Sequence, residues 1–138
     1  PWPACRATHT SIEGVLSLME EHQIRPEEIR EIRIVLQEIG RMVTEPREVK
    51  YRPQSPAVAK FSLPFVVGTA VVYGNVGLDS FTPERLSDPA VLAMGDKVTC
   101  LGVDYEVQAA QPIRVGETLT HWWAVLRVRD GEVAQDGQ

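Results

Sequence analysis

The first nine residues, PWPACRATH, place a thiol, a guanidinium and an imidazole close together, on Cys5, Arg6 and His9. Cys5 and His9 are four positions apart, so a continuous helix would bring them onto one face. There the imidazole would lower the pKa of the thiol and make it a nucleophile. Pro3 and the helix-capping signal that follows place Cys5 ahead of the helix, so the competing interpretation is a buried cysteine and a helix-capping histidine. No third ligand lies nearby, so we expect no metal site.

A second group of polar side chains lies in the apolar run PAVAKFSLPFVVG. Lys60 in this setting either extends its ammonium to the edge of the apolar surface or meets an anion in a pocket. Ser62, one turn before Phe65, can hydrogen-bond a ligand or the backbone of its own helix. The sequence has no G-x-G-x-x-G, G-x-x-x-x-G-K-[ST], H-E-x-x-H or G-x-S-x-G motif. The commonest nucleotide, phosphate, zinc and serine-hydrolase sites are therefore not indicated.

The composition is that of one globular domain covering residues 1–138, with 43% hydrophobic and 24% charged residues. The net charge of −5 argues against nucleic-acid binding, which requires clustered positive charge. No segment reaches the roughly 18 apolar residues of a membrane helix, so we expect no membrane partner. Cys5 and Cys100 do not suggest a disulfide scaffold, and a cytoplasmic location is expected.

Several segments carry helix signals. Apolar residues at helical spacing predict a helix from Thr8 or Thr10 to about His22. The dipeptide Ser55–Pro56 begins a second helix that is apolar on most sides and should be central. Pro64 should kink that helix or divide it in two. The sequences FTPERL and SDPAVLAM each place a capping residue before a proline, which is typical of two further helix starts.

The remaining pattern is that of strands. EIRIVLQE alternates apolar and polar residues, which predicts a strand with one solvated face. KVTCLG and YEVQA predict short strands, and TLTHWWAVLRVRDGEVAQ predicts a long one ending in the Asp130–Gly131 hairpin signal. From about Gly40 to Gln54 there is no period, so we expect an irregular excursion over the surface. The order helix, strand, helices, strands predicts an α+β fold, a small, mostly antiparallel sheet with helices packed on one side.

Two blocks of the sequence resemble a known family. PWPACRATHTSIEGVLSLMEEH resembles the K-x-[YFW]-P-x-C-x-x-x-H-x-x-ID-like stretch that opens the C-terminal domain in the MmgE/PrpD family. SPAVAKFSLPFVVGTAVVYGNVGLDSFTPERLSDPAVLAM is similar to the A-K-F-S-L-P-[YF] … G-x-V-x-L-x-x-F-T … DPAV signature of that domain. The resemblance runs from Pro1 to about Val98 in the same order and spacing, and the last forty residues match as generic strands.

The resemblance implies a lyase- or isomerase-type enzyme, because members include 2-methylcitrate dehydratase, cis-aconitate decarboxylase and iminodisuccinate epimerase. It implies a cofactor-free, two-domain homo-oligomer, usually a dimer, whose active site lies between a large helical N-terminal domain and a smaller C-terminal lid. This chain would be the lid without the helical domain, nearly inactive alone, and the substrate a small di- or tricarboxylate. Removing a proton beside a carboxylate builds negative charge, which fixed cations stabilise while an acid/base group moves the proton.

The resemblance also implies roles for individual residues. The substrate-binding residues would be Arg6, Lys60, Ser62 and Phe65, and the catalytic residues would be His9 and Cys5. Cys5 occupies the position of a catalytic histidine in the decarboxylase branch, and Phe65 that of a tyrosine. Both differences favour dehydration or epimerisation over decarboxylation. A further lysine of the family would lie immediately before Pro1.

Two other hypotheses stay open at this point. The first is an orphan lid domain that binds a carboxylate or a protein through its exposed cleft face without catalysis. The second is a thiol enzyme built on Cys5.

Overall fold

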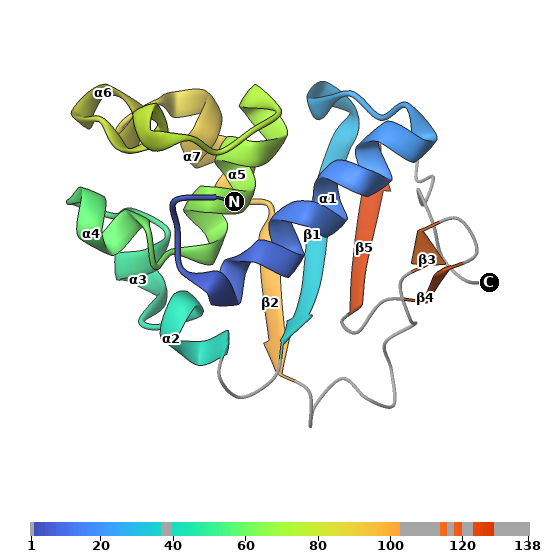
Figure 1. Ribbon diagram of the computed structural model, residues 1–138, viewed down its shortest axis with the longest axis horizontal. Helices are drawn as coiled ribbons and strands as arrows, with labels where there is room; N and C mark the ends of the chain where they lie inside the picture. The colour runs from blue at the N-terminus through green and yellow to red at the C-terminus, as the bar shows by residue number, and fades with distance from the viewer. Residues whose placement is uncertain (1, 37–39, 103–113, 116–117, 120–122, 129–138) are drawn as a thin grey trace.

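The computed structural model describes residues 2–36, 40–102, 114–115, 118–119 and 123–128. In chain order the elements are η1 (Arg6–Thr8), α1 (His9–His22), η2 (Pro26–Glu28), β1 (Ile29–Leu36), α2 (Arg41–Thr44), α3 (Arg47–Lys50), α4 (Pro56–Ala59), α5 (Leu63–Tyr73), η4 (Leu78–Phe81), α6 (Pro83–Leu86), α7 (Pro89–Gly95), β2 (Val98–Gly102), β3 (Arg114–Val115), β4 (Thr118–Leu119) and β5 (Trp123–Val128). Figure 1 shows α1 crossing one face of a sheet, with the other helices grouped beside it.

Within the described residues the main sheet has three strands in the order β2–β1–β5. The β1–β5 pair is antiparallel, and so is the small separate pair β3–β4, but β1 and β2 run parallel, in register from Ile32 opposite Val98 to Leu36 opposite Gly102. The predicted mostly antiparallel sheet is therefore wrong, although the fold is α+β overall. The parallel pair arises because the helices α2 to α7 form a long crossover between β1 and β2, which lets both strands run in the same direction.

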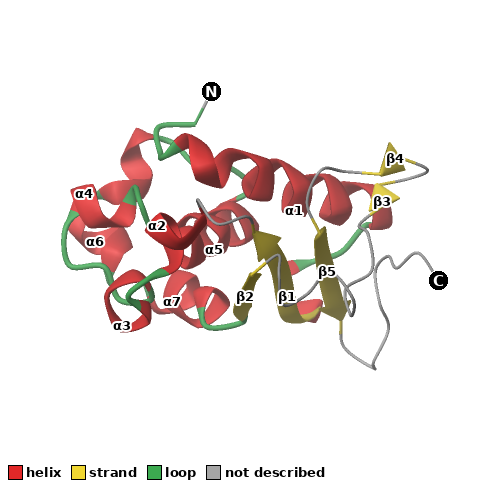
Figure 2. Ribbon diagram, turned by 90° about the horizontal axis from the view of Figure 1, so that it is seen from below, coloured by secondary structure: helices red, strands yellow, loops and turns green. Residues whose placement is uncertain are grey.

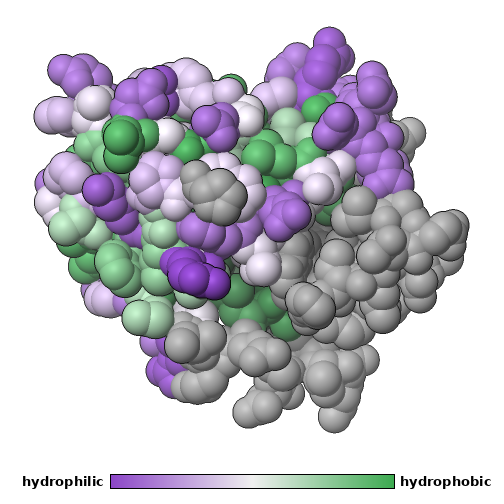
Figure 3. All heavy atoms as spheres, viewed as in Figure 1, coloured by the Kyte–Doolittle hydropathy of each residue, from purple (hydrophilic) through white to green (hydrophobic). Residues whose placement is uncertain are grey.

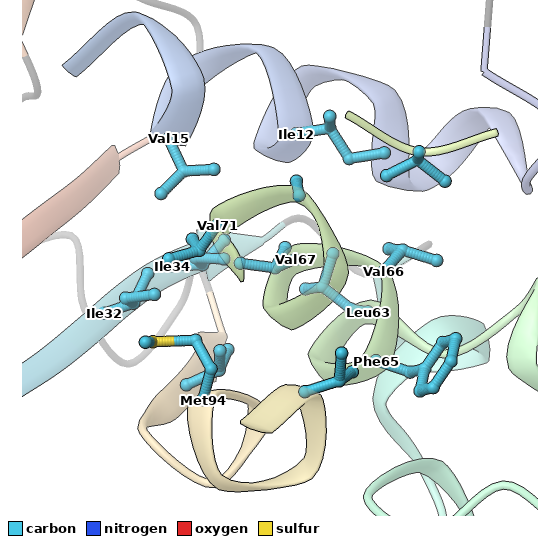
Figure 4. Close-up of a cluster of buried hydrophobic side chains, with 14 of the residues drawn as sticks. Ile12, Val15, Ile32, Ile34, Leu63, Phe65, Val66, Val67, Val71 and Met94 are labelled. Carbon is cyan, nitrogen blue, oxygen red and sulfur yellow. The ribbon is translucent and has the colours of Figure 1, made fainter. Parts of the chain in front are cut away.

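Helix α5 forms the centre of the core. All residues from Leu63 to Val71 are buried, because this helix has no polar face. In Figure 4, α5 lies between α1 and α7, and Ile12 of α1 and Met94 of α7 approach it from opposite sides. Figure 2 shows α1 over the sheet from a second direction. The expected central helix is thus confirmed, as is the first helix, which ends at His22.

Capping residues begin the short helices as the sequence indicates. Ser55 Oγ accepts a hydrogen bond from the backbone N–H of Val58 at 3.2 Å, and α4 follows. Pro64 divides the predicted helix, because α5 begins separately with the proline in its first turn, where no backbone N–H is needed. Thr82 and Asp88 cap α6 and α7, the two further predicted helices.

The segment from Gly40 to Gln54 differs from the expected irregular excursion. It contains the one-turn helices α2 and α3, which are too short to show a helical period in the sequence. It is also part of the core, since Val43 is fully buried and Tyr51 is 8% exposed. The Tyr51 hydroxyl donates a hydrogen bond to the backbone carbonyl of Val98 on β2. This segment is therefore attached to the sheet.

Three strand predictions are confirmed, that of EIRIVLQE by β1, and other predictions concern parts of the chain outside the described residues. KVTCLG forms β2, and β5 provides a strand within the long C-terminal segment. The predicted YEVQA strand and the Asp130–Gly131 hairpin lie outside the described residues. In the described part of the chain, no helix combines the length and apolarity needed to cross a bilayer.

The contact between α5 and α7 predicts the effect of adding one methyl group. A Cβ at Gly68 would lie 2.8 Å from the backbone carbonyl oxygen of Val91 and 3.0 Å from the backbone nitrogen of Gly95. Backbone atoms cannot move aside cheaply, so we expect Gly68→Ala to lower the free energy of unfolding by about 1–3 kcal/mol despite the better helix propensity of alanine. Urea denaturation measures this difference. Gly77→Ala is the control, because its nearest neighbour is the carboxylate oxygen of the Asp79 side chain, at 3.1 Å.

The buried contact between Tyr51 and β2 predicts a loss of stability in alkali. Burial raises the pKa of Tyr51 to about 12 and that of the Cys100 thiol to about 11. From about pH 9 to 12 the unfolded chain therefore holds fewer of these protons than the native state, so stability falls as pH rises. Urea midpoints measured across this range should show the fall, and Tyr51→Phe should flatten its upper part. Parallel curves for the two proteins would contradict the assignment to Tyr51.

Candidate functional site

The two chemically reactive stretches of the sequence meet in the structure. The backbone N–H of Cys5 donates a hydrogen bond to the backbone carbonyl of Lys60 at 2.9 Å. Lys60 lies between α4 and α5, in a segment of residues 60–62 that we call the Lys60 turn. Figure 1 shows the N-terminal segment in front of α5. One main-chain hydrogen bond thus joins the start of the chain to this turn.

One hydrogen bond and one ring contact with the chain start hold the His9 side chain. Its Nε2 lies 3.0 Å from the backbone carbonyl oxygen of Ala4, and the Trp2 ring packs edge-on at 5.4 Å between centroids. A carbonyl oxygen can only accept, so Nε2 carries the proton of this bond. In the neutral imidazole, Nδ1 is then left with a lone pair that can accept a proton. His9 therefore does not cap α1 but can act as a base.

Cys5 precedes the helical segment. Its backbone angles, φ −57° and ψ 135°, are not helical, and η1 begins at the next residue. The carbonyl of Cys5 accepts from both the backbone N–H and the hydroxyl of Thr8, at 2.9 and 2.7 Å. Cys5 is a free, half-buried thiol, and the hydrogen bond described for the His9 ring goes to Ala4 rather than to Cys5. The continuous helix that would place Cys5 and His9 on one face is not formed.

Arg6 and Lys60 provide two positive charges next to the Cys5–Lys60 backbone bond. Arg6 is exposed, and Lys60 is half-buried with its Nζ 5.6 Å from the centroid of the Phe81 ring, a cation–π distance. Across the described ranges of the chain, neither residue forms a salt bridge with a carboxylate. Figure 3 shows hydrophilic residues gathered over the N-terminal segment on this face. Within the described residues, both positive charges are therefore left without an opposite charge.

Ser62 and Phe65, two predicted ligand contacts, are buried beneath the Lys60 turn. The Ser62 hydroxyl donates to the backbone carbonyl of Lys50 and accepts from the backbone N–H of Phe65 at 3.1 Å. The Phe65 side chain is 2% exposed and packs against Phe81 with ring centroids 6.0 Å apart. In this structure both residues support the turn from below, and their role as ligand contacts stays a prediction.

Lys50 is a residue of this region that sequence reasoning missed. Its side chain is 9% exposed, and its Nζ donates to the backbone carbonyl of Phe61 at 3.0 Å. No motif or spacing distinguishes it, because it lies in the segment that was expected to run over the surface. The lysine of the sequence KYRP, residues 50–53, is a weak signal without the fold.

The other possible sites are a metal site and a surface hollow. The described residues contain no group of three or more histidine, cysteine or acidic side chains able to hold a metal ion. An open hollow of about 650 Å³ lies at α2 and α3, lined by Arg41, Met42, Glu45, Pro46 and Arg47. It contains none of the predicted site residues. The Lys60 turn and the N-terminal segment are thus the candidate site.

The buried Ser62 hydroxyl predicts a stability effect. Ser62→Ala leaves the Phe65 N–H and the Lys50 carbonyl without this partner in the core, so we expect a loss of about 1–3 kcal/mol in the free energy of unfolding. Thermal or urea unfolding measures the loss. Ser87→Ala is the matched control, because Ser87 is exposed with contacts at 3.4 Å and its removal should cost less than about 0.5 kcal/mol. Equal stabilities of the two variants would contradict a supporting role for Ser62.

Comparison with known proteins identifies the family. No curated protein matches the chain. The family profile described as MmgE/PrpD C-terminal domain matches residues 2–136, which is nearly the entire chain and includes both stretches joined at the Lys60 turn. The chain therefore belongs to the MmgE/PrpD family, as its C-terminal domain.

Proposed function

We propose that this chain is the lid domain of a cofactor-free MmgE/PrpD enzyme that dehydrates a small di- or tricarboxylate, as 2-methylcitrate dehydratase does. The observation that carries the proposal is the pair of cations, Arg6 and Lys60, on either side of the Cys5–Lys60 backbone bond. The family match over residues 2–136 gives this pair its chemical context. The enzyme would work in the cytoplasm as a homo-oligomer, with a helical N-terminal domain completing the cleft.

The two cations suit a carboxylate substrate. A guanidinium can hold a carboxylate through two parallel hydrogen bonds, and an ammonium adds a compact positive charge. When a proton is removed from the carbon beside that carboxylate, negative charge spreads onto its oxygens. Cations fixed before the reaction stabilise this charge without having to reorganise. Arg6 and Lys60 are therefore proposed to bind the substrate and lower the barrier.

His9 is proposed to move a proton. The hydrogen bond from Nε2 to the Ala4 carbonyl fixes the ring and leaves Nδ1 as the basic nitrogen. A histidine suits this role because its imidazole can both accept and donate a proton. Cys5, four residues earlier in the chain, is proposed to contribute its thiol to the same site. The other acid/base groups would come from the helical domain.

The residues at two family positions favour dehydration over decarboxylation. Cys5 stands where the decarboxylase branch has a histidine, and Phe65 stands where it has a tyrosine. Phe65 is buried against Phe81 and has no hydroxyl to offer a substrate. Epimerisation of a similar substrate would use the same proton abstraction and is the closest alternative chemistry.

The cation pair predicts the effect of two substitutions on turnover. In the two-domain protein, Arg6→Ala and Lys60→Ala should each lower kcat/KM for 2-methylcitrate dehydration by about 100-fold, because each removes a charge that faces the developing negative charge. The rate of formation of the unsaturated product measures this. Arg30→Ala is the control, since Arg30 is an exposed arginine on β1, away from the Lys60 turn. Full activity of both variants would overturn the assignment.

A second experiment separates the lid of an enzyme from a non-catalytic binding module. Both cations come from this chain, so binding of a carboxylate by the chain alone is a specific possibility. Isothermal titration of the isolated chain with citrate tests it. No measurable binding is the expected result for an incomplete cleft, whereas tight binding that Lys60→Ala abolishes would favour the module.

A further inference from the structure

Lys50 and the Lys60 turn are joined in both directions. The Lys50 ammonium donates to the carbonyl of Phe61 at 3.0 Å, and the Ser62 hydroxyl donates to the carbonyl of Lys50. Lys50 is the last residue of α3, so these two bonds attach that helix to the turn. The contact involves the residue directly after Lys60, and it does not involve the Lys60 side chain.

The charge of Lys50 is costly where it stands. Its side chain is 9% exposed, and within the described residues it has no carboxylate partner. Burying an ammonium without an opposite charge is unfavourable, and a neutral donor could satisfy one carbonyl at lower cost. A lysine is therefore an unusual choice for a contact that serves stability alone.

The hydrogen bonds of the Lys60 turn hold its main chain in place and do not involve the side chain of Lys60. The carbonyl of Lys60 accepts from Cys5, the carbonyl of Phe61 accepts from Lys50, and the Ser62 hydroxyl caps α5. Three consecutive residues are thus attached to three different elements. A displacement at Lys50 would move the Lys60 side chain and, through the Cys5 bond, the backbone next to Arg6.

We propose that Lys50 is a positioning residue for carboxylate binding, which acts by fixing the Lys60 turn so that Lys60 and Arg6 face the same carboxylate group. This inference rests on the proposed function of Lys60. Lys50 would thus influence which carboxylates the domain binds.

A double-mutant cycle in the two-domain protein tests this inference. Lys50→Met removes the charge and the donor at similar length, and we expect kcat/KM for 2-methylcitrate to fall about 10- to 100-fold. Because Lys50 acts through Lys60, adding Lys50→Met to Lys60→Ala should change kcat/KM by less than about threefold. Lys50→Arg, which keeps the charge and the donors, should restore most of the activity. If Lys50→Met does not fold, Lys50→Gln takes its place in the same cycle.

Lys97→Met is the matched control. The Lys97 ammonium also donates to a backbone carbonyl, that of Ile29 at 2.7 Å, but it does so at the start of β1. This variant should lose thermal stability while keeping KM and kcat. Additive losses in the Lys50–Lys60 cycle, or an active Lys50→Met, would overturn the positioning role while leaving the proposed function intact. A Lys60→Ala variant that keeps full turnover would instead overturn the proposed function.

Discussion

The burial of α5 on all its sides is the constraint on which the rest of the structure depends. A helix without a polar face must be enclosed by other elements, and here α1 and α7 cover it from opposite sides. The approach of α7 is close because Gly68 and Gly95 leave room for backbone atoms, with the carbonyl of Pro64 only 3.0 Å from where a Cβ of Gly95 would lie. This packing fixes the N-terminal end of α5, where the Lys60 turn ends.

The candidate site is thus attached to the packed core around α5. Ser62 connects the N-terminal end of α5 to α3, and the Cys5–Lys60 bond adds the N-terminal segment. Tyr51, the next residue after Lys50, attaches the same region to β2. Cations held on such a frame need little rearrangement when a substrate binds, which is what electrostatic stabilisation of a transition state requires.

The sequence predicts those elements whose signals are local. Caps and prolines define α4, α5, α6 and α7, and an apolar stripe defines α1. The direction of strand pairing is not a local property, since the alternation in β1 is the same beside a parallel or an antiparallel neighbour. Helices of a single turn, such as α2 and α3, have no period to detect. The mostly antiparallel sheet and the surface excursion were wrong for these two reasons.

The site shows the same division between local and tertiary information. The position of Cys5 before the helix follows from nearby residues. The burial of Ser62 and the contact of Lys50 with the turn depend on packing between distant segments, so spacing in the sequence could not show them. Family resemblance located the turn, but it did not show which of its side chains are available to a ligand.

The hydrogen bond between Cys5 and Lys60 is made by main-chain atoms alone, so it does not depend on which side chain stands at position 5. Any side chain other than proline at position 5 leaves the donor N–H in place. The reactive group at that position can therefore be exchanged without moving the neighbouring cations. If the domain binds a carboxylate as proposed, one substitution at position 5 can therefore change the reacting group while Arg6 and Lys60 keep their places.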